Sequence, residues 1–278
     1  MSYNWSYIHI GKIIKQLRQK YKLSQEELAK GICSQAHISK IEREIQFPSG
    51  VMLYLLAQKL RISVDYLFNP ENAAEDKERK QIKEMIRKSI RFNDYEQALK
   101  IIADEQTQSL FSSPYNQQFL LWAKAGCLFY YENKPDVCMK LLKEALKKTT
   151  DNLNHCTEQE LLIINSVGII FAENKKNRMA LKILLWVYKE IQNLHHIEDQ
   201  HFIVKNTYAC ARSLYRLGKY EEAIHFCNIG VKRNYDHDRL YLLGELYYIK
   251  GLCCLFLNYT HLSIESFKRS LCLFHLKN

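Results

Sequence analysis

The chain has 278 residues, of which 47% are hydrophobic and only four are proline, and its formal net charge is +10. This length favours two domains, and the composition excludes a disordered chain. No apolar run reaches the roughly 18 to 20 residues that cross a bilayer, and the start MSYNWSYIHIG lacks the layout of a secretory signal. We therefore expect a folded, largely helical and cytoplasmic protein that does not enter a membrane.

Two short helices joined by a tight turn are predicted within residues 23–49. Ser24 is followed three residues later by Glu27, which is the pattern of a capping box, so a helix begins there. Gly31 permits the left-handed residue that often ends a helix, and Ser34 caps the next helix. This arrangement predicts a helix-turn-helix.

The second of these helices has an inner and an outer face. Ile38 and Ile41 are three residues apart and face inward. The cap and the outer face together supply candidate DNA contacts, which are Ser34, Gln35, Ala36, His37, Ser39, Lys40 and Arg43. In a helix-turn-helix, the first residues of the second helix lie against base edges in the major groove.

The side-chain chemistry divides these candidates by role. Gln35 is the expected base reader, because its amide donates and accepts together and so suits adenine. Lys40 and Arg43 are expected to hold phosphates, and His37 can do either. Gln25, in the first turn of the preceding helix, is expected to position the protein on a phosphate. The alternative is an ordinary pair of helices with solvated polar residues.

The flanking sequence completes a small domain. An earlier helix carries an apolar stripe at Ile10, Ile13, Ile14 and Leu17, residues 51–60 read as a fourth helix, and Ser63 caps a short fifth. The first seventy residues hold ten Lys or Arg against five Asp or Glu, a net charge of +5 that suits phosphate binding. The segments LSQEELA, IS, KIE, PS and SVDYLF are similar to Xre or Cro type helix-turn-helix domains over residues 8–68. Glu44 departs from that family, which usually has glycine there, so the exit from the recognition helix is expected to differ slightly.

The sequence turns polar after this domain and then becomes repetitive. The stretch NPENAAEDKERK indicates a linker running into a new helix, which gives domains at 1–68 and 80–278 joined by residues 69–79. Small residues recur at spacings of 40, 42, 43 and 40, at Ala98, Cys138, Ala180, Ala223 and Ser263. Such periods are typical of helical solenoids.

A second column of small residues supports this register. Twelve residues before the last four anchors stand Gly126, Gly168, Ala211 and Gly251, as expected where two helices approach closely. The segments NDYEQAL and GKYEEAI resemble the turn and second helix of tetratricopeptide repeats. We therefore expect an all-α fold, in which a five-helix domain is followed by a right-handed superhelix of about five tetratricopeptide-like helix pairs.

The first helices of such an array line a concave groove. The groove positions chosen by this register include Lys83, Arg87, Ala123, Asn165, Lys205, Tyr208, Arg212, Glu245 and Tyr248, with Arg91 and Asn206 close to them. A mixed lining of this kind suits a short peptide. Lys83, Arg87 and Arg91 can hold a terminal carboxylate, and Asn165 can bond a peptide amide in both directions. The alternative is a merely solvated basic face.

The nine cysteines and ten histidines give no site. The cysteines are odd in number and have no CxxC pair, so neither a disulfide framework nor a zinc site is predicted, and we expect no metal and no cofactor. An oxidation switch at Cys33, in the predicted turn, is the alternative left open.

The two halves together resemble the PlcR-like branch of peptide-responsive regulators in Gram-positive bacteria. The segments NQQFLLWA, FAEN and LLGELYYIKG look like parts of that family and indicate a paralogue within it. The resemblance implies a homodimeric, quorum-sensing transcription regulator that binds double-stranded DNA at an inverted-repeat promoter site and a short signalling peptide in its repeats. It also implies that Asn165 matches a peptide-binding asparagine, whereas Asn206 matches a second one only if its helix is shifted by about a turn.

Two other classes of function compete with this one. The predicted groove holds no nucleophile with its base, no phosphate loop and no paired carboxylates, so an enzyme is not expected. A constitutive DNA-binding protein that uses its repeats as a docking scaffold for another protein is the main alternative.

Overall fold

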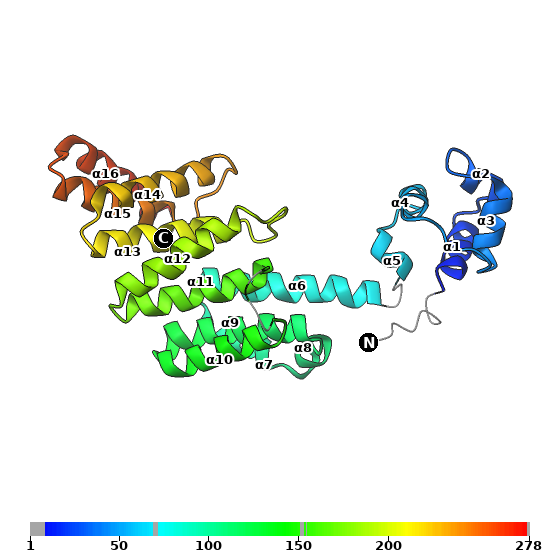
Figure 1. The fold of residues 1–278 in the computed structure, drawn as a ribbon, viewed down its shortest axis with the longest axis horizontal. Helices are drawn as coiled ribbons and strands as arrows, with labels where there is room; N and C mark the ends of the chain where they lie inside the picture. The colour runs from blue at the N-terminus through cyan, green and yellow to red at the C-terminus, as the bar shows by residue number, and fades with distance from the viewer. Residues whose placement is uncertain (1–8, 69–71, 151–152, 154, 277–278) are drawn as a thin grey trace. The chain divides into compact units, whose positions relative to one another are not determined.

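The computed structural model describes residues 9–68, 72–150, 153 and 155–276. Within these residues the protein is helical and contains no strand, which confirms the all-α prediction (Figure 1). The chain divides into two compact units, Met1–Glu84 and Met85–Asn278, which are described separately. No helix in the described part of the chain is long and apolar enough to span a bilayer.

Five short helices form the first part of unit 1, as predicted. They are α1 (Ile10–Lys20), α2 (Gln25–Ala29), α3 (Gln35–Glu42), α4 (Gly50–Lys59) and α5 (Val64–Phe68). The capping box is present, because Ser24 Oγ accepts from the backbone nitrogen of Glu27 at 3.0 Å and Glu27 Oε2 accepts from that of Ser24 at 2.6 Å. Gly31 has a φ of +81°, the left-handed conformation expected at the end of α2.

Apolar side chains from all five helices form one core in this unit. Ile14, Leu28, Ile38, Leu56 and Leu67 are completely buried in it. Each fully buried side chain of this size contributes about 1.5–3 kcal/mol through its removal from water. The core therefore fixes which faces of α2 and α3 remain exposed.

The exit from α3 keeps the left-handed conformation although glycine is absent. Glu44 has a φ of +59°, and the expected slight difference of this exit from that of the family stays a prediction. Its carboxylate accepts from His9 Nδ1 at 3.1 Å and lies 3.9 Å from Lys12 Nζ. These contacts hold a side chain that glycine could not supply.

Most of the predicted linker is helical. α6 (Asn72–Arg91) begins within it, and residues 69–71 lie outside the described part of the chain. α6 starts in unit 1 and ends in unit 2, because the division between the units falls after Glu84.

Unit 2 consists of stacked helix pairs. After the end of α6 it contains α7 (Tyr95–Ala103), α8 (Glu105–Leu110), α9 (Pro114–Glu132), α10 (Pro135–Lys147), α11 (Glu158–Glu173), α12 (Asn177–Ile191), α13 (Phe202–Arg216), α14 (Tyr220–Tyr235), α15 (Leu243–Phe256) and α16 (Thr260–His275). The pairs α9/α10, α11/α12, α13/α14 and α15/α16 pack most closely (Figure 1). The short α8 is an addition that the repeat pattern did not predict.

The repeat register is confirmed by burial. All five anchor residues lie on the second helix of a pair and are buried, at Ala98, Cys138, Ala180, Ala223 and Ser263. The first helices α9, α11, α13 and α15 contact one another in sequence, so they form a continuous surface.

The column of small residues has two different causes. A Cβ on Gly168 would lie 2.9 Å from Leu184 Cγ, and one on Gly251 would lie 2.8 Å from the Phe267 ring, so these glycines permit close packing. No described atom beyond its chain neighbours and the backbone of its own helix lies within 4 Å of a Cβ built on Gly126. The expectation of close helix approach is therefore wrong at Gly126, which lines a small pocket instead.

Candidate functional site

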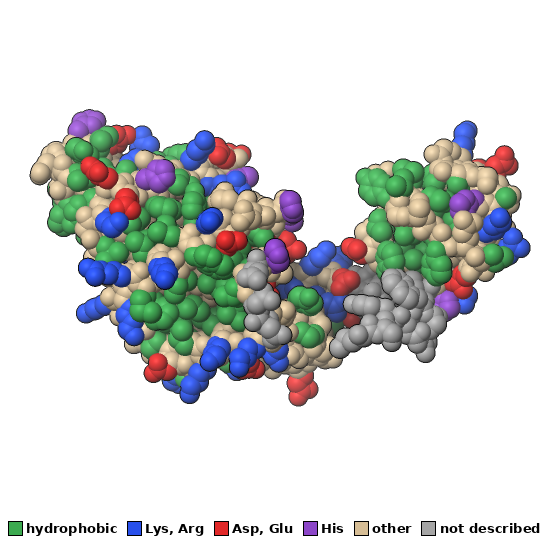
Figure 2. Space-filling view, viewed as in Figure 1, with side chains coloured by type: hydrophobic (Ala, Val, Ile, Leu, Met, Phe, Trp, Pro, Cys, Tyr) green, Lys and Arg blue, Asp and Glu red, His purple; other side chains and the backbone are tan. Residues whose placement is uncertain are grey.

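The outer face of α3 presents most of the candidate DNA contacts to solvent. Ser34 caps α3, and its Oγ accepts from the backbone nitrogen of His37 at 3.2 Å. Ile38 and Ile41 are buried beneath the helix. The exposed candidates are Ser34, Gln35, Ala36, Lys40 and Arg43, whereas His37 and Ser39 are half-buried. Figure 2 shows Lys and Arg side chains along the edge of unit 1 where α1 and α3 lie.

A hydrogen-bonded relay fixes the expected base reader. Gln35 Nε2 donates to Gln25 Oε1 at 2.7 Å, and Gln25 Nε2 donates to Glu42 Oε2 at 2.8 Å. Arg18 then holds Glu42 through two bonds, from Nε at 2.6 Å and from an Nη at 3.1 Å. Gln25 is therefore a support for Gln35 as well as a candidate phosphate contact.

The buried end of this relay was missed by the sequence analysis. Burial disfavours the charged form of Glu42, but the hydrogen bonds from Arg18 and Gln25 outweigh it and lower the pKa of this carboxyl. The same pair raises the pKa of Arg18, chiefly through the hydrogen bond to Glu42. The signal was the position of Glu42, four residues after Ile38 on the buried face, where an acidic side chain needs a partner.

Two other candidates on α3 are partly engaged by the protein itself. Arg43 Nε donates to the backbone oxygen of Ser39 at 3.2 Å, which ties the start of its guanidinium group to the helix end. His37 Nε2 is buried and has no hydrogen-bond partner among the described residues. Lys40, by contrast, is exposed on α3 and makes no side-chain hydrogen bond or ion pair with the described residues.

In unit 2, Tyr130 on α9, Tyr208 on α13 and Tyr241 just before α15 lie in one region, which we call the hollow. Tyr130, Tyr208 and Tyr241 interact electrostatically with one another or with common charged groups, and burial raises the pKa of each hydroxyl. For Tyr130 the pKa rises to about 12, although the residue is 51% exposed. Tyr130 also lines the small pocket on α9 that Trp122 and Lys205 border.

The charged groups of this hollow include several predicted groove residues. The charge of Arg91 lowers the pKa of Tyr241 and that of Glu245 raises it. The charge of Arg212 lowers the pKa of Tyr130 and of Tyr208, so each contribution is smaller than the effect of burial. Five predicted residues, Arg91, Lys205, Tyr208, Arg212 and Glu245, therefore belong to one part of unit 2.

Asn165 and Asn206 lie together beneath the surface. Both are fully buried, and Asn206 Nδ2 donates to Asn165 Oδ1 at 2.9 Å and to the Leu184 backbone oxygen at 3.0 Å. Asn165 Nδ2 has no acceptor among the described residues. α13 places the Asn206 side chain directly against Asn165, and the match of Asn206 to a second peptide-binding asparagine stays a prediction.

Arg212 is held by an acidic partner in the hollow. Its two Nη atoms contact the two carboxylate oxygens of Glu173, one of them at 3.0 Å. Arg216 donates to the Ala172 backbone oxygen at 2.7 Å and lies 3.4 Å from the same carboxylate. Arg212 is therefore neutralised within the protein.

A row of cations and aromatic rings runs across α6, α9 and α13. The Arg87 guanidinium lies 5.4 Å from the Phe119 ring centroid, the Phe119 and Trp122 rings are 5.6 Å apart, and Lys205 Nζ lies 5.9 Å from the Trp122 ring. The two distances between a cation and a ring are typical of cation–π contacts. Trp122 Nε1 donates to Ser166 Oγ at 3.0 Å, which fixes the ring.

The remaining groove candidates are less central. Ala123 is buried and lines the small pocket beside Trp122. Tyr248 is exposed on α15, with its ring 5.9 Å from that of Phe267. Lys83 is half-buried on the part of α6 that belongs to unit 1.

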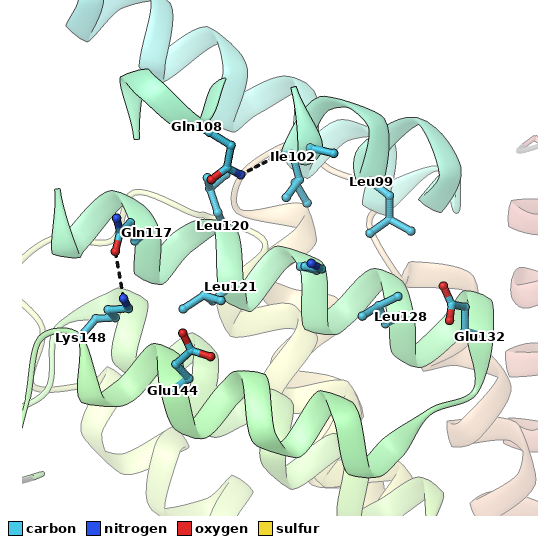
Figure 3. A pocket seen from close by; sticks show the side chains of 12 residues that line it. Leu99, Ile102, Gln108, Gln117, Leu120, Leu121, Leu128, Glu132, Glu144 and Lys148 are labelled. Carbon is cyan, nitrogen blue, oxygen red and sulfur yellow. Dashed lines mark hydrogen bonds between the residues drawn. The ribbon is translucent and has the colours of Figure 1, made fainter. Parts of the chain in front are cut away.

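A larger pocket of about 490 Å³ lies on the face of α9 opposite to the one that carries Trp122 and the small pocket (Figure 3). Leu99, Leu121 and Leu128 give it an apolar floor, and Lys148 Nζ donates to Gln117 Oε1 at 3.0 Å at its edge. None of the predicted peptide-binding residues lines it.

The cysteines are free thiols, and no group of described side chains has the arrangement of a metal site. Burial raises the pKa of Cys127 and of Cys210 to about 12, which keeps these thiols protonated and unreactive. Burial also raises the pKa of Cys33, so the structure gives no support to an oxidation switch there.

Comparison with known proteins gives two family matches and a set of similar structures. Residues 79–278 match the RNPP family C-terminal domain, and residues 14–67 match a helix-turn-helix family. No curated protein matches the chain significantly.

Among solved structures, PlcR of Bacillus thuringiensis in complex with the peptide PapR7 and DNA is 26% identical, with a TM-score of 0.80 over 97% of this chain and 95% of that one. The apo form of the same protein is 22% identical, with a TM-score of 0.66 over 97% and 94%. ComR of S. thermophilus, in complex with DNA and its signalling peptide ComS, is 16% identical, with a TM-score of 0.65 over 96% and 93%. The last two show likeness of fold.

Proposed function

The chain belongs to the RNPP family, and on this premise we propose that it is a sequence-specific DNA-binding transcription regulator whose repeat unit binds a short signalling peptide. The observation that carries the proposal is its likeness, over almost the whole chain, to a protein solved with both a peptide and DNA. The exposed outer face of α3 supports the DNA-binding role, and the pocket beside Trp122 together with the Asn165–Asn206 amide pair supports the peptide-binding role.

The division of labour follows the matched regions. We propose a DNA-binding domain at 1–68, a connection at 69–79 and a peptide-binding domain at 80–278. The helix-turn-helix match ends at residue 67 and the RNPP match begins at residue 79, which supports these bounds. Action on DNA implies a cytoplasmic protein, and the role requires no catalytic step.

We propose homodimeric binding to an inverted repeat. Half-sites of such a repeat lie about one helical turn apart, about 34 Å, or a multiple of it. A peptide changes DNA affinity only through a preference for one arrangement of the dimer over another. Peptide binding in unit 2 would then select the arrangement in which both α3 helices fit the two half-sites.

The test is recovery of genomic DNA on the purified protein, followed by sequencing, with and without synthetic heptapeptides from neighbouring reading frames. A palindromic consensus whose enrichment depends on a peptide is expected. Peptide-independent enrichment would favour the scaffold alternative. Absence of salt-sensitive retention that depends on Lys40 and Arg43 would reject the DNA-binding role.

A further inference from the structure

The small pocket beside Trp122 and Ala123 of α9 is lined mainly by apolar residues. Among the described residues that line it, Lys205 is the one with a charged side chain. The pocket wall is formed by Trp122, Ala123, Tyr130 and Ile169, among other residues. Its volume, about 30 Å³, is that of about one water molecule, so a peptide side chain enters only if its walls move. The ammonium group is the charged feature that this pocket offers to a ligand.

The ammonium group lacks a neutralising partner. No carboxylate of the described residues lies within ion-pair distance of Lys205 Nζ, in contrast to Arg212, which Glu173 neutralises. Asp199 attracts Lys205 from further away, and Asp199 Oδ1 already accepts from the backbone nitrogen of His201 at 3.0 Å. The nearest compensation is the face of the Trp122 ring.

This situation is unfavourable without a ligand. Lys205 is half-buried, and a cation that loses part of its hydration without gaining a counter-ion is destabilised, which a ring face offsets only in part. Burial accordingly lowers the pKa of Lys205. An incoming anion would restore the missing interaction and would gain a charge-assisted hydrogen bond in a partly desolvated place.

We propose that Lys205 binds a carboxylate of the signalling peptide, so that this protein selects peptides with a negative charge placed beside the Trp122 wall. The assignment rests on the proposed function, and it moves the carboxylate site away from Lys83 and Arg87. The Arg87 guanidinium stacks on Phe119, its Nε is buried, and it does not line the pocket. The carboxylate belongs either to the peptide C-terminus or to an Asp or Glu side chain.

Pools of synthetic heptapeptides distinguish these sources. One set of random pools carries a free C-terminal carboxylate and a second set carries a C-terminal amide, and each is made with Asp and Glu included or replaced by Asn and Gln. Peptides retained by the full-length protein are identified by mass spectrometry. Enrichment of carboxylate over amide termini assigns the terminal group, and enrichment of Asp or Glu at one position in both sets assigns a side chain.

Lys205→Met tests the residue, and Lys176→Met is the matched control. Lys176 Nζ also lies 5.9 Å from an aromatic ring, that of Phe171, but Lys176 is exposed and does not line the pocket. We expect Lys205→Met to lower the affinity for the selected peptides at least about tenfold and to abolish the preference for a carboxylate. Lys176→Met should bind these peptides with the affinity and the preference of the wild-type protein.

Two results would overturn the assignment. Equal retention of neutral and anionic pools by the wild-type protein would remove the carboxylate requirement without needing any variant to fold, while leaving peptide binding intact. An unaltered carboxylate preference in Lys205→Met would assign the anion to another residue. If no pool is retained, the proposed peptide function fails together with this assignment.

Discussion

The side-chain amide of Gln35 donates to Oε1 of Gln25 across a distance of 2.7 Å, which joins the first turns of α2 and α3. This bond uses one of the two Nε2 hydrogens and leaves the other hydrogen and the carbonyl oxygen of Gln35 for a partner. Adenine requires one donor and one acceptor from a glutamine in the major groove. The relay to Glu42 and Arg18 thus sets the orientation of the amide before DNA arrives.

Replacement of Gln35 should relax recognition at a single base pair. For Gln35→Ala we expect a loss of about 1–3 kcal/mol of discrimination at one position of each half-site, with other positions unchanged. Binding to a library of single-base variants of the selected site measures this. Gln58→Ala is the control, because Gln58 is exposed on α4 and donates to Tyr54. A uniform loss at all positions would show that Gln35 does not read a base.

Replacement of Lys40 should weaken binding to all sequences alike. Removing one lysine from a phosphate reduces the slope of log affinity against log salt by about one, so Lys40→Ala should show that change without altered base preference. Fluorescence anisotropy on duplex oligonucleotides over a range of salt concentrations gives the slope. Lys100→Ala, which removes an exposed lysine paired with Glu96 in unit 2, should leave the slope unchanged.

The relay predicts a pH dependence of unit 1. The pKa of Glu42 is lower in the folded protein than in the unfolded chain, so its contribution to stability is full above the unfolded pKa and is lost as pH falls through the folded pKa. The free energy of unfolding should therefore decline below about pH 4.5, the unperturbed value. Chemical denaturation across pH 3–7, which is about the range needed, measures this decline.

Glu42→Ala checks the same pair at neutral pH. Removal of one partner of a buried ion pair costs about 3–5 kcal/mol, because Arg18 is left uncompensated. Glu42→Gln should fold with a weaker dependence on acid than the wild-type protein. An identical acid profile for Glu42→Gln and wild type would contradict the assignment.

Local signals in the sequence predicted much of unit 1. Ser24, Glu27, Gly31 and Ser34 act within a few residues of themselves, so the caps and the turn followed from short-range chemistry. The partnership of Glu42 with Arg18 joins residues 24 apart, and only the packed helices determine which cation meets the carboxylate. Sequence spacing located the need for a partner, but it did not identify the partner.

In unit 2, too, the sequence predicted the local features but not the contacts between distant residues. The register located the second helices and the buried anchors, because a small residue recurs at the same place in each second helix. It did not predict α8, the direct contact of Asn206 with Asn165, or the neutralisation of Arg212 by Glu173. Each of these depends on the rotation of one helix against the next, which a column of small residues does not fix.

The buried amide pair should matter for peptide affinity. Asn165→Ala removes the amide whose Nδ2 lacks a partner among the residues that the structure describes, and we expect peptide binding to weaken by about 1–3 kcal/mol while the DNA-binding residues remain untouched. Calorimetry with a heptapeptide retained from the synthetic pools gives the affinity. Unchanged affinity would exclude Asn165 from the site.

Two glycines at equivalent repeat positions should respond to alanine with opposite sign. Gly168→Ala should destabilise unit 2 by about 1–3 kcal/mol, because its Cβ would lie 2.9 Å from the buried Leu184 side chain. Gly126→Ala should stabilise by up to about 1 kcal/mol, because alanine favours helix and the space beside it is open. Thermal unfolding of the pair decides this, and equal shifts would contradict it.

The placement of Trp122 beside Lys205 also gives the protein an intrinsic optical reporter. An indole ring that faces an ammonium group emits according to the local electric field, and a bound anion would alter that field within contact distance. Occupancy of the hollow should therefore change the wavelength and intensity of tryptophan emission, so ligand binding can be followed in the unlabelled protein.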